Sequence, residues 1–293
     1  MPVKSQSAME YLMTYGWAIL IIAVVLSVLF QLGVFSSGNF QPHAQAGACQ
    51  VSKTVAGVSL EGQCNGVLPQ YVAQFNGQSS YITLPANSVM STAGSFSVSA
   101  WFTTTNNGVI VYVGSAQMPN EPYSWLNPLY VTQSGLLYGG DDNGPIFETT
   151  NAVSNGAWHF AVLTQNTGSQ IETLYLDGAQ VGVITSHLGS SITPYYWTIG
   201  GGSSSGANWP GLPVTSYFNG KIANVQMYNT SLSGTEIQTL YLEGIGGAPV
   251  RPQNLTGWWP LNGNANDYSG NGNNGQLNGV TFSSSWESGY TAP

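Results

Sequence analysis

Apolar and polar residues follow two different patterns along this chain. From Tyr11 to Val34 there is no charged residue, and the centre of this run, Trp17 to Phe30, is almost entirely apolar. Because about 20 apolar residues are enough to cross a bilayer, the run predicts a transmembrane helix. From Tyr71 onward, apolar and polar residues alternate in short runs separated by Gly, Asn, Asp and Ser. That alternation predicts β-strands with one buried face.

Short strands and one helix are predicted after the apolar run. The alternating runs cover residues 71–75, 81–84, 96–102, 158–164, 173–176 and 180–185. Asp177-Gly178 lies between the last two runs and is typical of a tight hairpin turn. A helix is predicted from Ser233, which forms a capping box with Glu236, until Gly244 ends it. Many short antiparallel strands predict a two-sheet sandwich or jelly roll.

The composition agrees with a mainly β protein and excludes several other classes. Only 5% of the 293 residues are charged, whereas soluble domains usually carry about 25%. Aromatic residues make up 12% and glycine accounts for 37 residues, so neither a disordered chain nor a coiled coil fits. The net charge is −8 and the 4 basic residues are scattered, so no nucleic-acid partner is expected.

The charges around the apolar run predict an extracellular position for the rest of the chain. Lys4 precedes the run, the next positive charge is Lys53, and positive charges stay on the cytoplasmic side. Residues 36–70 have the composition of a linker and contain the 2 cysteines, Cys49 and Cys64. In an extracellular chain these cysteines predict a disulfide worth about 3 kcal/mol, with two free buried thiols as the alternative.

The residues before the apolar run resemble a known processing site. The segment Lys4-Ser-Gln-Ser-Ala-Met-Glu-Tyr-Leu12 is similar to the cleavage region of archaeal type IV pilin precursors, the class III signal peptides. The resemblance implies that a prepilin peptidase cuts between Ser5 and Gln6. Ser5 departs from the Gly that the family usually has before the cut. The alternatives are a plain membrane anchor and a secretory signal peptide, whose cut would follow the apolar run.

The same resemblance implies a role for Glu10. Residues 1–5 would be a leader and residues 6–35 the hydrophobic helix of the mature subunit, with Glu10 at the position where the family carries its Glu. A lone carboxylate in an apolar helix is costly unless it is paired, and the free amine of Gln6 on a neighbouring subunit would pair with it. Alternatively, Glu10 only interacts with the helix dipole. The implied protein is a subunit of a helical homopolymer at the cell surface, inserted in the membrane before assembly.

Four segments of the β region resemble the laminin G-like, concanavalin A-like lectin family. They are Ala73-Gln-Phe-Asn-Gly-Gln-Ser-Ser-Tyr-Ile-Thr-Leu84, Phe96-Ser-Val-Ser-Ala-Trp101, Trp158-His-Phe-Ala-Val162 with Leu174-Tyr-Leu-Asp-Gly178, and Phe218-Asn-Gly-Lys-Ile-Ala-Asn-Val-Gln-Met-Tyr228. The resemblance implies a two-sheet jelly roll within residues 71–293. It also implies a lectin-like, adhesive domain whose partners would be surface glycans.

One segment departs from the order of elements in that family. Residues 257–277 look like the segment that normally opens such a domain, but here they follow the predicted closing helix. They would complete their own sandwich by circular permutation, complete the sandwich of a neighbouring subunit, or begin a truncated second domain. We favour the permutation, because the two ends of a domain often lie close together.

Catalytic activity is not expected from the sequence. The glucanases of this fold carry Glu-x-Asp-x-x-Glu on one strand, and that spacing is absent, since Asp141, Asp142 and Glu148 lie in a Gly-rich loop. A retaining glycosidase needs two carboxyl groups about 5–5.5 Å apart, and no pattern predicts such a pair. His159 stands at the start of a strand, where we interpret it as structural. A glucan-cleaving enzyme is therefore the least favoured function.

One loop offers oxygen ligands for a cation. Asn262, Asn264 and Asp267 stand close together in the sequence, and a hard cation such as Ca²⁺ prefers oxygen ligands. The alternative, which we favour, is that these residues only form turns. Asp141 and Asp142 are a second and weaker calcium candidate. No other cofactor is expected.

Aromatic residues in predicted loops are the candidates for sugar contacts. Trp125, Tyr195, Tyr196 and Trp209 stand among Pro, Asn, Gly and Ser, although each of them alone is also explained by loop packing onto the sandwich. The favoured function is a pilus-like subunit that displays a lectin-like domain. The alternative is a membrane-anchored carbohydrate-binding protein that does not polymerise.

Two sequons provide candidate sites for N-glycans. They are Asn229-Thr-Ser231 and Asn254-Leu-Thr256, and an extracellular chain is exposed to glycosylation. The helix predicted to begin at Ser233 lies close to Asn229 in the sequence, so we expect it to shield that site.

Overall fold

The structure is a computed structural model that describes residues 8–31, 68–120, 125–140, 147–185, 192–203, 209–212 and 215–293. The chain divides into two compact units, Met1–His43 and Ala44–Pro293. Several predictions fall outside the described residues: the cut between Ser5 and Gln6, the cysteines Cys49 and Cys64, most of the linker, and Asp141 with Asp142.

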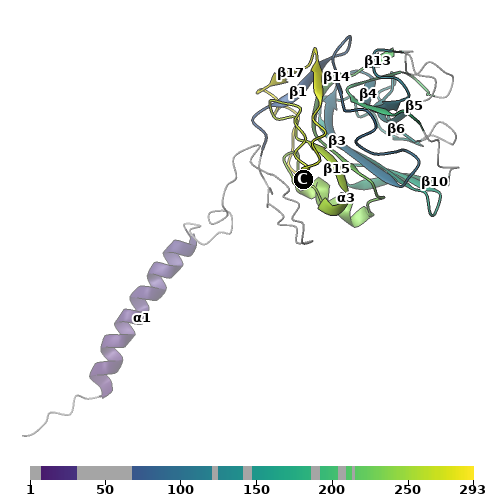
Figure 1. The fold of residues 1–293 in the computed structure, drawn as a ribbon. Helices are drawn as coiled ribbons and strands as arrows, with labels where there is room; N and C mark the ends of the chain where they lie inside the picture. Colours follow the sequence, from purple (N-terminus) through teal and green to yellow (C-terminus); the bar gives the residue numbers. More distant parts are fainter. Residues whose placement is uncertain are drawn as a thin grey trace, which may run out of the picture. The chain divides into compact units, whose positions relative to one another are not determined.

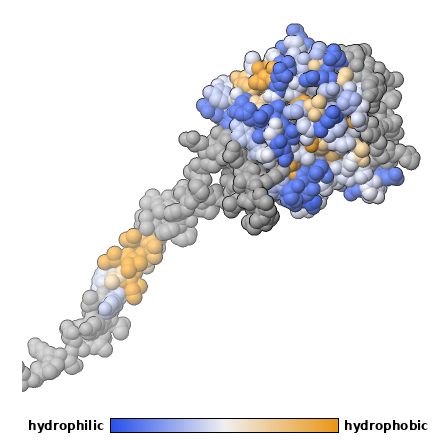
Figure 2. Space-filling model, viewed as in Figure 1, coloured by the Kyte–Doolittle hydropathy of each residue, from blue (hydrophilic) through white to orange (hydrophobic). Residues whose placement is uncertain are grey.

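The first unit contains helix α1 (Ala8–Gln31), which lies within the expected range 6–35 and includes Glu10. Its large apolar side chains, where described, are 47% to 67% exposed: Tyr15, Trp17, Ile19, Leu20, Ile21, Ile22, Val24, Val25 and Leu26. Figure 2 shows an apolar (orange) surface along the described part of the helix. Among the described residues, no helix has the length and hydropathy needed to cross a membrane.

The second unit is a sandwich of two antiparallel sheets (Figure 1). The first sheet contains, in spatial order, β10 (Ala179–Thr185), β9 (Ile171–Leu176), β8 (Trp158–Asn166), β3 (Phe96–Thr104), β14 (Asn219–Tyr228), β1 (Val72–Asn76) and β17 (Thr281–Ser283), with β15 (Leu255–Trp259) also paired to β14. The second sheet contains β16 (Gln276–Asn278), β2 (Tyr81–Thr83), β11 (Tyr196–Ile199), β4 (Gly108–Gly114), β5 (Trp125–Val131), β6 (Leu137–Gly139) and β7 (Phe147–Glu148). A small pair, β12 (Gly201–Ser203) and β13 (Thr215–Tyr217), is separate from both.

The predicted mainly β fold is confirmed, and each of the six alternating runs coincides with a strand. The Asp177-Gly178 turn joins β9 and β10, with positive φ angles of 50° and 75°. Strand β4 was not predicted, because every residue from Val109 to Val113 is fully buried and the run does not alternate. Strand β5 was missed as well, since it contains Pro128, and proline is unusual inside a strand. Its register against β4 shifts twice.

The first sheet separates two apolar clusters. Val98, Ala100 and Phe102 of β3 face the core between the sheets, whereas Trp101 belongs to a cluster on the outer face. Helix α3 (Gly234–Leu242) covers this outer face with Ile237 and other buried side chains. The capping box predicted for its N-terminus is present. A short 3₁₀ helix, η1 (Pro252–Asn254), precedes β15.

The C-terminal segment completes the sandwich of its own chain. Strand β15 pairs with β14 and β17 with β1 in the first sheet, whereas β16 pairs with β2 in the second. The start of the domain lies beside its end, since Tyr71 N donates to Asn262 Oδ1 over 2.8 Å and Trp286 Nε1 to the Pro69 carbonyl over 2.9 Å. This pairing within one chain is the arrangement favoured from the sequence.

Candidate functional site

Two of the predicted aromatic residues lie on the outer face of the second sheet, on either side of one glycine. Tyr196 of β11 is paired with Gly114 of β4, and Gly114 is paired with Trp125 of β5. Trp197 points into the core, where its ring lies 6.2 Å from that of Phe96, so its neighbour Tyr196 points outward. Residues paired across strands share a face, so Trp125 and Tyr196 flank Gly114 about 10 Å apart. Both side chains are partly exposed.

Gly114 is required between these two aromatic residues. A Cβ at this position would lie only 2.1 Å from the hydroxyl oxygen of Tyr112, so the phenol of Tyr112 reaches across Gly114. Tyr112 itself is fully buried. Gly114 is buried as well, so the space between Trp125 and Tyr196 is occupied by the phenol of Tyr112.

Tyr195 lies next to this pair, but its polar atoms serve the fold. Its backbone N–H donates to Asn87 Oδ1, and its hydroxyl donates to the Asn87 carbonyl, each over 2.9 Å. These bonds fix the chain where it enters β11. The backbone around Tyr196 is thus held in place before any ligand arrives.

Trp209 is a correction to the sequence analysis. It is only 5% exposed, and its ring packs edge-to-face against that of Tyr130 at 5.7 Å. Tyr130 stands at the opposite end of β5 from Trp125. The structure therefore places Trp125 and Tyr196 on one face, holds Tyr195 through its bonds to Asn87, and uses Trp209 for loop packing.

A second group on this face was not predicted. Tyr130, Tyr138 and Glu148 are paired in register across β5, β6 and β7, and the hydroxyl of Tyr138 donates to Glu148 Oε2. Burial, followed by the bond to Glu148 and its charge, raises the pKa of Tyr138 to about 12. Burial also raises the pKa of Tyr130, with smaller contributions from the other two residues. These residues stand on three short consecutive strands, and only the register of those strands reveals the group.

The middle of the outer face is covered by β12. A Cβ on Gly202 would lie within 3.0 Å of Asn127, Val109 and Tyr112, which shows how closely this strand packs on β4 and β5. Several buried polar atoms here make no hydrogen bond to any described residue: Trp125 Nε1, Asn127 Oδ1, Tyr130 Oη, Thr198 Oγ1 and Ser216 Oγ. Buried polar atoms are nearly always paired in folded proteins. These atoms lie beneath the surface of the face, where no described residue pairs with them.

The candidate calcium loop is built as a set of turns. Asp267 Oδ1 accepts the N–H groups of Trp258 and Ser269 over 3.0 and 2.9 Å, and its Oδ2 accepts that of Asn273 over 2.9 Å. Likewise, the side-chain oxygens of Asn262 and Asn264 accept backbone N–H groups, from Tyr71 and Asn266. Within the described ranges, no group of three or more His, Cys, Asp or Glu residues is arranged to hold a metal. Calcium binding here stays a prediction.

His159 has contacts of the structural kind that the sequence suggested. Its Nδ1 lies 2.8 Å from Asp177 Oδ2, and its Nε2 lies 3.1 Å from Asn155 Oδ1. Asp177 also accepts the N–H of Phe160 over 2.8 Å. These contacts join β8 to the turn between β9 and β10.

Comparison with protein families identifies the domain. A laminin G profile of the concanavalin A-like lectin/glucanases superfamily matches residues 76–238, more than half of the chain. The chain belongs to this family. A comparison with curated proteins found no match.

Solved structures share the fold at low sequence identity. A Bacteroides ovatus protein assigned as carbohydrate binding is 16% identical with a TM-score of 0.51, over 77% of this chain and 66% of that one, just under two thirds. The heptameric SAP-like pentraxin of Limulus polyphemus is 14% identical with a TM-score of 0.48, over 72% of this chain and 94% of its own. Domains LG4-5 of the mouse laminin alpha1 chain are 17% identical with a TM-score of 0.42, over 64% and 46%.

Proposed function

We propose that this protein binds carbohydrate at the cell surface through the outer face of its second sheet. The observation that carries the proposal is the placement of Trp125 and Tyr196 on either side of Gly114, on one face and both partly exposed. Aromatic faces offer flat apolar surfaces to the C–H groups of a sugar ring, and nearby polar atoms fix its hydroxyl groups. The assignment of the Bacteroides ovatus protein as carbohydrate binding supports the same function.

Binding to a panel of immobilised polysaccharides and oligosaccharides, both neutral and acidic, tests this proposal. We expect at least one sugar to bind the wild type, and Trp125→Ala and Tyr196→Ala each to weaken that binding about tenfold, as the loss of one aromatic contact implies. Tyr71→Ala is the matched control, because Tyr71 is a partly exposed aromatic residue elsewhere on the domain. No binding to the panel, or equal losses in all three variants, would contradict the proposal.

A second proposal concerns helix α1, which we infer packs against copies of itself in a type IV pilus-like filament. Its described apolar side chains are 47% to 67% exposed, and such a surface is stabilised by burial. The resemblance to pilin precursors around Ser5, Gln6 and Glu10 supports the filament. A membrane-anchored protein that does not polymerise is the alternative. The N-terminal residue of the mature protein separates them, because the filament subunit would begin at Gln6.

Replacing Glu10 tests the filament directly. Glu10→Ala would leave the amine of Gln6 buried without a partner, which costs about 3–5 kcal/mol for each subunit. We therefore expect few or no filaments by electron microscopy of cells that express the variant. Glu287→Ala, which removes an exposed carboxylate from the second unit, is the control and should assemble normally. Wild-type numbers of filaments that contain the Glu10→Ala subunit would contradict the proposed pairing.

A further inference from the structure

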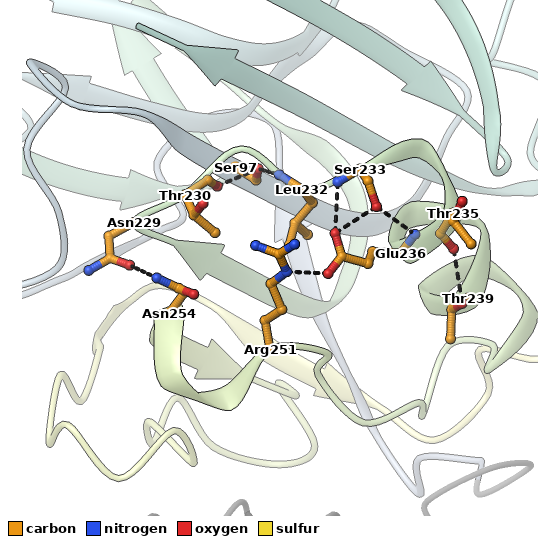
Figure 3. Close-up of polar contacts among 10 residues, drawn as sticks. All are labelled: Ser97, Asn229, Thr230, Leu232, Ser233, Thr235, Glu236, Thr239, Arg251 and Asn254. Atoms are coloured by element: carbon orange, nitrogen blue, oxygen red, sulfur yellow. Dashed lines mark hydrogen bonds and ion pairs between the residues drawn. The ribbon is translucent and has the colours of Figure 1, made fainter. Parts of the chain in front are cut away.

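The two sequons lie in contact with each other. Asn229 follows β14, and Asn254 is the last residue of η1. The backbone N–H of Asn229 donates to the carbonyl of Asn254 over 3.0 Å. Their side chains also meet, since Nδ2 of Asn254 donates to Oδ1 of Asn229 over 3.0 Å (Figure 3). The two candidate acceptor amides therefore differ: the amide nitrogen of Asn254 is engaged as a donor, whereas Asn229 takes part through its amide oxygen.

The groups of the second sequon are engaged in the fold. The amide nitrogen of Asn254 donates to Asn229, and the hydroxyl of Thr256 donates to the carbonyl of Met227 over 3.0 Å. Leu255 between them is 1% exposed and is paired with Tyr228 in the first sheet. A transferase that needs both the amide and the hydroxyl of this sequon would have to break two hydrogen bonds and detach a strand.

The groups of the first sequon are available. The side chain of Asn229 is exposed, and in Figure 3 its amide nitrogen points away from Asn254. Neither this nitrogen nor the hydroxyl of Ser231 makes a hydrogen bond to a described residue. The expected shielding by the following helix is thus wrong, because α3 begins at Gly234 and leaves Asn229 uncovered.

A buried serine holds the first sequon in a defined turn. The hydroxyl of Ser97 donates to the carbonyl of Thr230 over 2.8 Å and accepts the N–H of Leu232 over 2.9 Å. These bonds fix the backbone on both sides of Ser231 (Figure 3). The turn therefore presents the exposed side chain of Asn229 and the partly exposed side chain of Ser231 without any local unfolding.

We propose that Asn229 is the N-glycan acceptor of the folded protein and that Asn254 stays unmodified. The co-reactant is an oligosaccharide linked to a lipid phosphate, and the catalyst is a membrane oligosaccharyltransferase. Nδ2 of Asn229 forms a bond to the anomeric carbon, and the bond from that carbon to the phosphate oxygen breaks. The lipid phosphate leaves with the bonding electrons, and the amide proton passes to a base of the transferase. The amide oxygen of Asn229 still accepts from Asn254 afterwards, so the fold keeps its contact.

The test compares the folded full-length chain with the same chain unfolded in denaturant and diluted into the reaction. The oligosaccharyltransferase and lipid-linked donor are chosen because they modify synthetic peptides of both sequons. Intact mass and peptide mapping then give the number and position of the glycans. We expect one glycan, on Asn229, in the folded protein, and glycans on both asparagines when the unfolded chain is modified before it can refold.

Two variants make the assignment specific. Ser231→Ala removes the partly exposed hydroxyl of the first sequon and should abolish modification of the folded protein, whereas Thr256→Ala should leave it unchanged. Circular dichroism verifies that both variants remain folded. A glycan on Asn254 of the folded wild type, on both asparagines, or on neither would overturn the proposal.

Discussion

The outer faces of the two sheets differ in how far other parts of the chain cover them. On the first sheet, α3 and the C-terminal segment bury a second apolar cluster, in which the indole nitrogens of Trp158, Trp258 and Trp286 donate hydrogen bonds, whereas that of Trp101 has no partner among the described residues. On the second sheet, Trp125 is partly exposed, and its indole nitrogen and the Asn127 side-chain oxygen have no partner among the described residues. Unpaired buried polar atoms cost stability. Both faces hold one indole nitrogen that no described residue pairs with, so the difference lies in coverage: the first face is closed over its tryptophans, whereas the second leaves Trp125 partly exposed.

Truncating one tryptophan on each face tests the difference in burial between the two faces most strongly. Trp258 is 2% exposed, and its Nε1 donates to Asn224 Oδ1 over 2.7 Å. Trp258→Ala should lower the free energy of unfolding by about 3–5 kcal/mol, because it leaves a large cavity. Trp125→Ala should cost only about 1 kcal/mol, since its side chain is partly in water. Urea denaturation of both variants provides the measurement.

Measuring the sugar affinity of Trp258→Ala and Trp125→Ala provides a control, because the expected order of the two effects is reversed. Once corrected for the folded fraction, Trp258→Ala should keep the affinity of the wild type, whereas Trp125→Ala should weaken sugar binding about tenfold. Equal losses of stability in the two variants would show that the two faces do not differ.

The next largest effect is expected in the loop of Asp267, next to the first face. Its carboxylate accepts three backbone N–H groups, so Asp267→Ala removes all three bonds. We expect a loss of about 2–4 kcal/mol, because bonds to a charged group are stronger than neutral ones. Thermal melting with Ca²⁺ and with a chelator shows whether the loop also binds calcium. If the residues only form turns, the Tm of the wild type is the same in both solutions.

A chelator-sensitive Tm that becomes insensitive in Asp267→Ala would contradict the turn-forming interpretation. It would establish the calcium site that the sequence suggested. Asp267→Asn is the useful intermediate variant, since one side-chain oxygen still accepts N–H groups.

A smaller effect is expected where α3 begins to cover the first face. Ser233 and Glu236 form the capping box of this helix, and Glu236 also pairs with Arg251 (Figure 3). Ser233→Ala should cost about 1 kcal/mol, as the loss of an N-cap usually does. Thr235→Ala, at an exposed position in the same turn, should change stability by no more than about 0.5 kcal/mol. Denaturant unfolding that ranks the two variants in the reverse order would contradict this account of the cap.

The strands that could be predicted are those with one buried and one less buried face. The run before the Asp177-Gly178 turn and the capped helix carry local signals, and both were found. Strand β4 carries no such signal, since Val109 to Val113 are buried on both faces under β12. A fully buried strand loses its alternation, so the pattern could not reveal it.

The candidate site could be predicted by residue type but not by position. Trp125 and Trp209 look alike in the sequence, because both stand among turn-forming residues. The register places Trp125 beside Gly114 and Tyr196, whereas Trp209 is buried against Tyr130. Register is a property of paired strands, so neither outcome follows from the loop sequence alone.

The smallest expected effect concerns the tyrosines of the two faces at alkaline pH. Tyr138 on the second face has its pKa raised to about 12 by burial and by Glu148, whereas Tyr290 on the first has its pKa raised by burial alone. An unfolded tyrosine ionises near pH 10, so between about pH 10 and 12 the folded chain keeps a proton that the unfolded chain has lost. The contribution of Tyr138 to stability is therefore present below pH 10 and is lost as the pH rises through this range.

The variant Glu148→Gln separates the two causes of the raised pKa of Tyr138, which are burial and the Glu148 carboxylate. Without the carboxylate, the charge that disfavours a phenolate at Tyr138 is gone while burial remains, so its pKa should fall toward 10 without reaching it. Phenolate absorbance followed against pH measures this shift, and Tyr138→Phe assigns the transition to that residue. The titration of Tyr290 should not change, because burial is its cause. Identical curves for the wild type and Glu148→Gln would show that the carboxylate does not act on Tyr138, and the group on the second face would then be no more than packing.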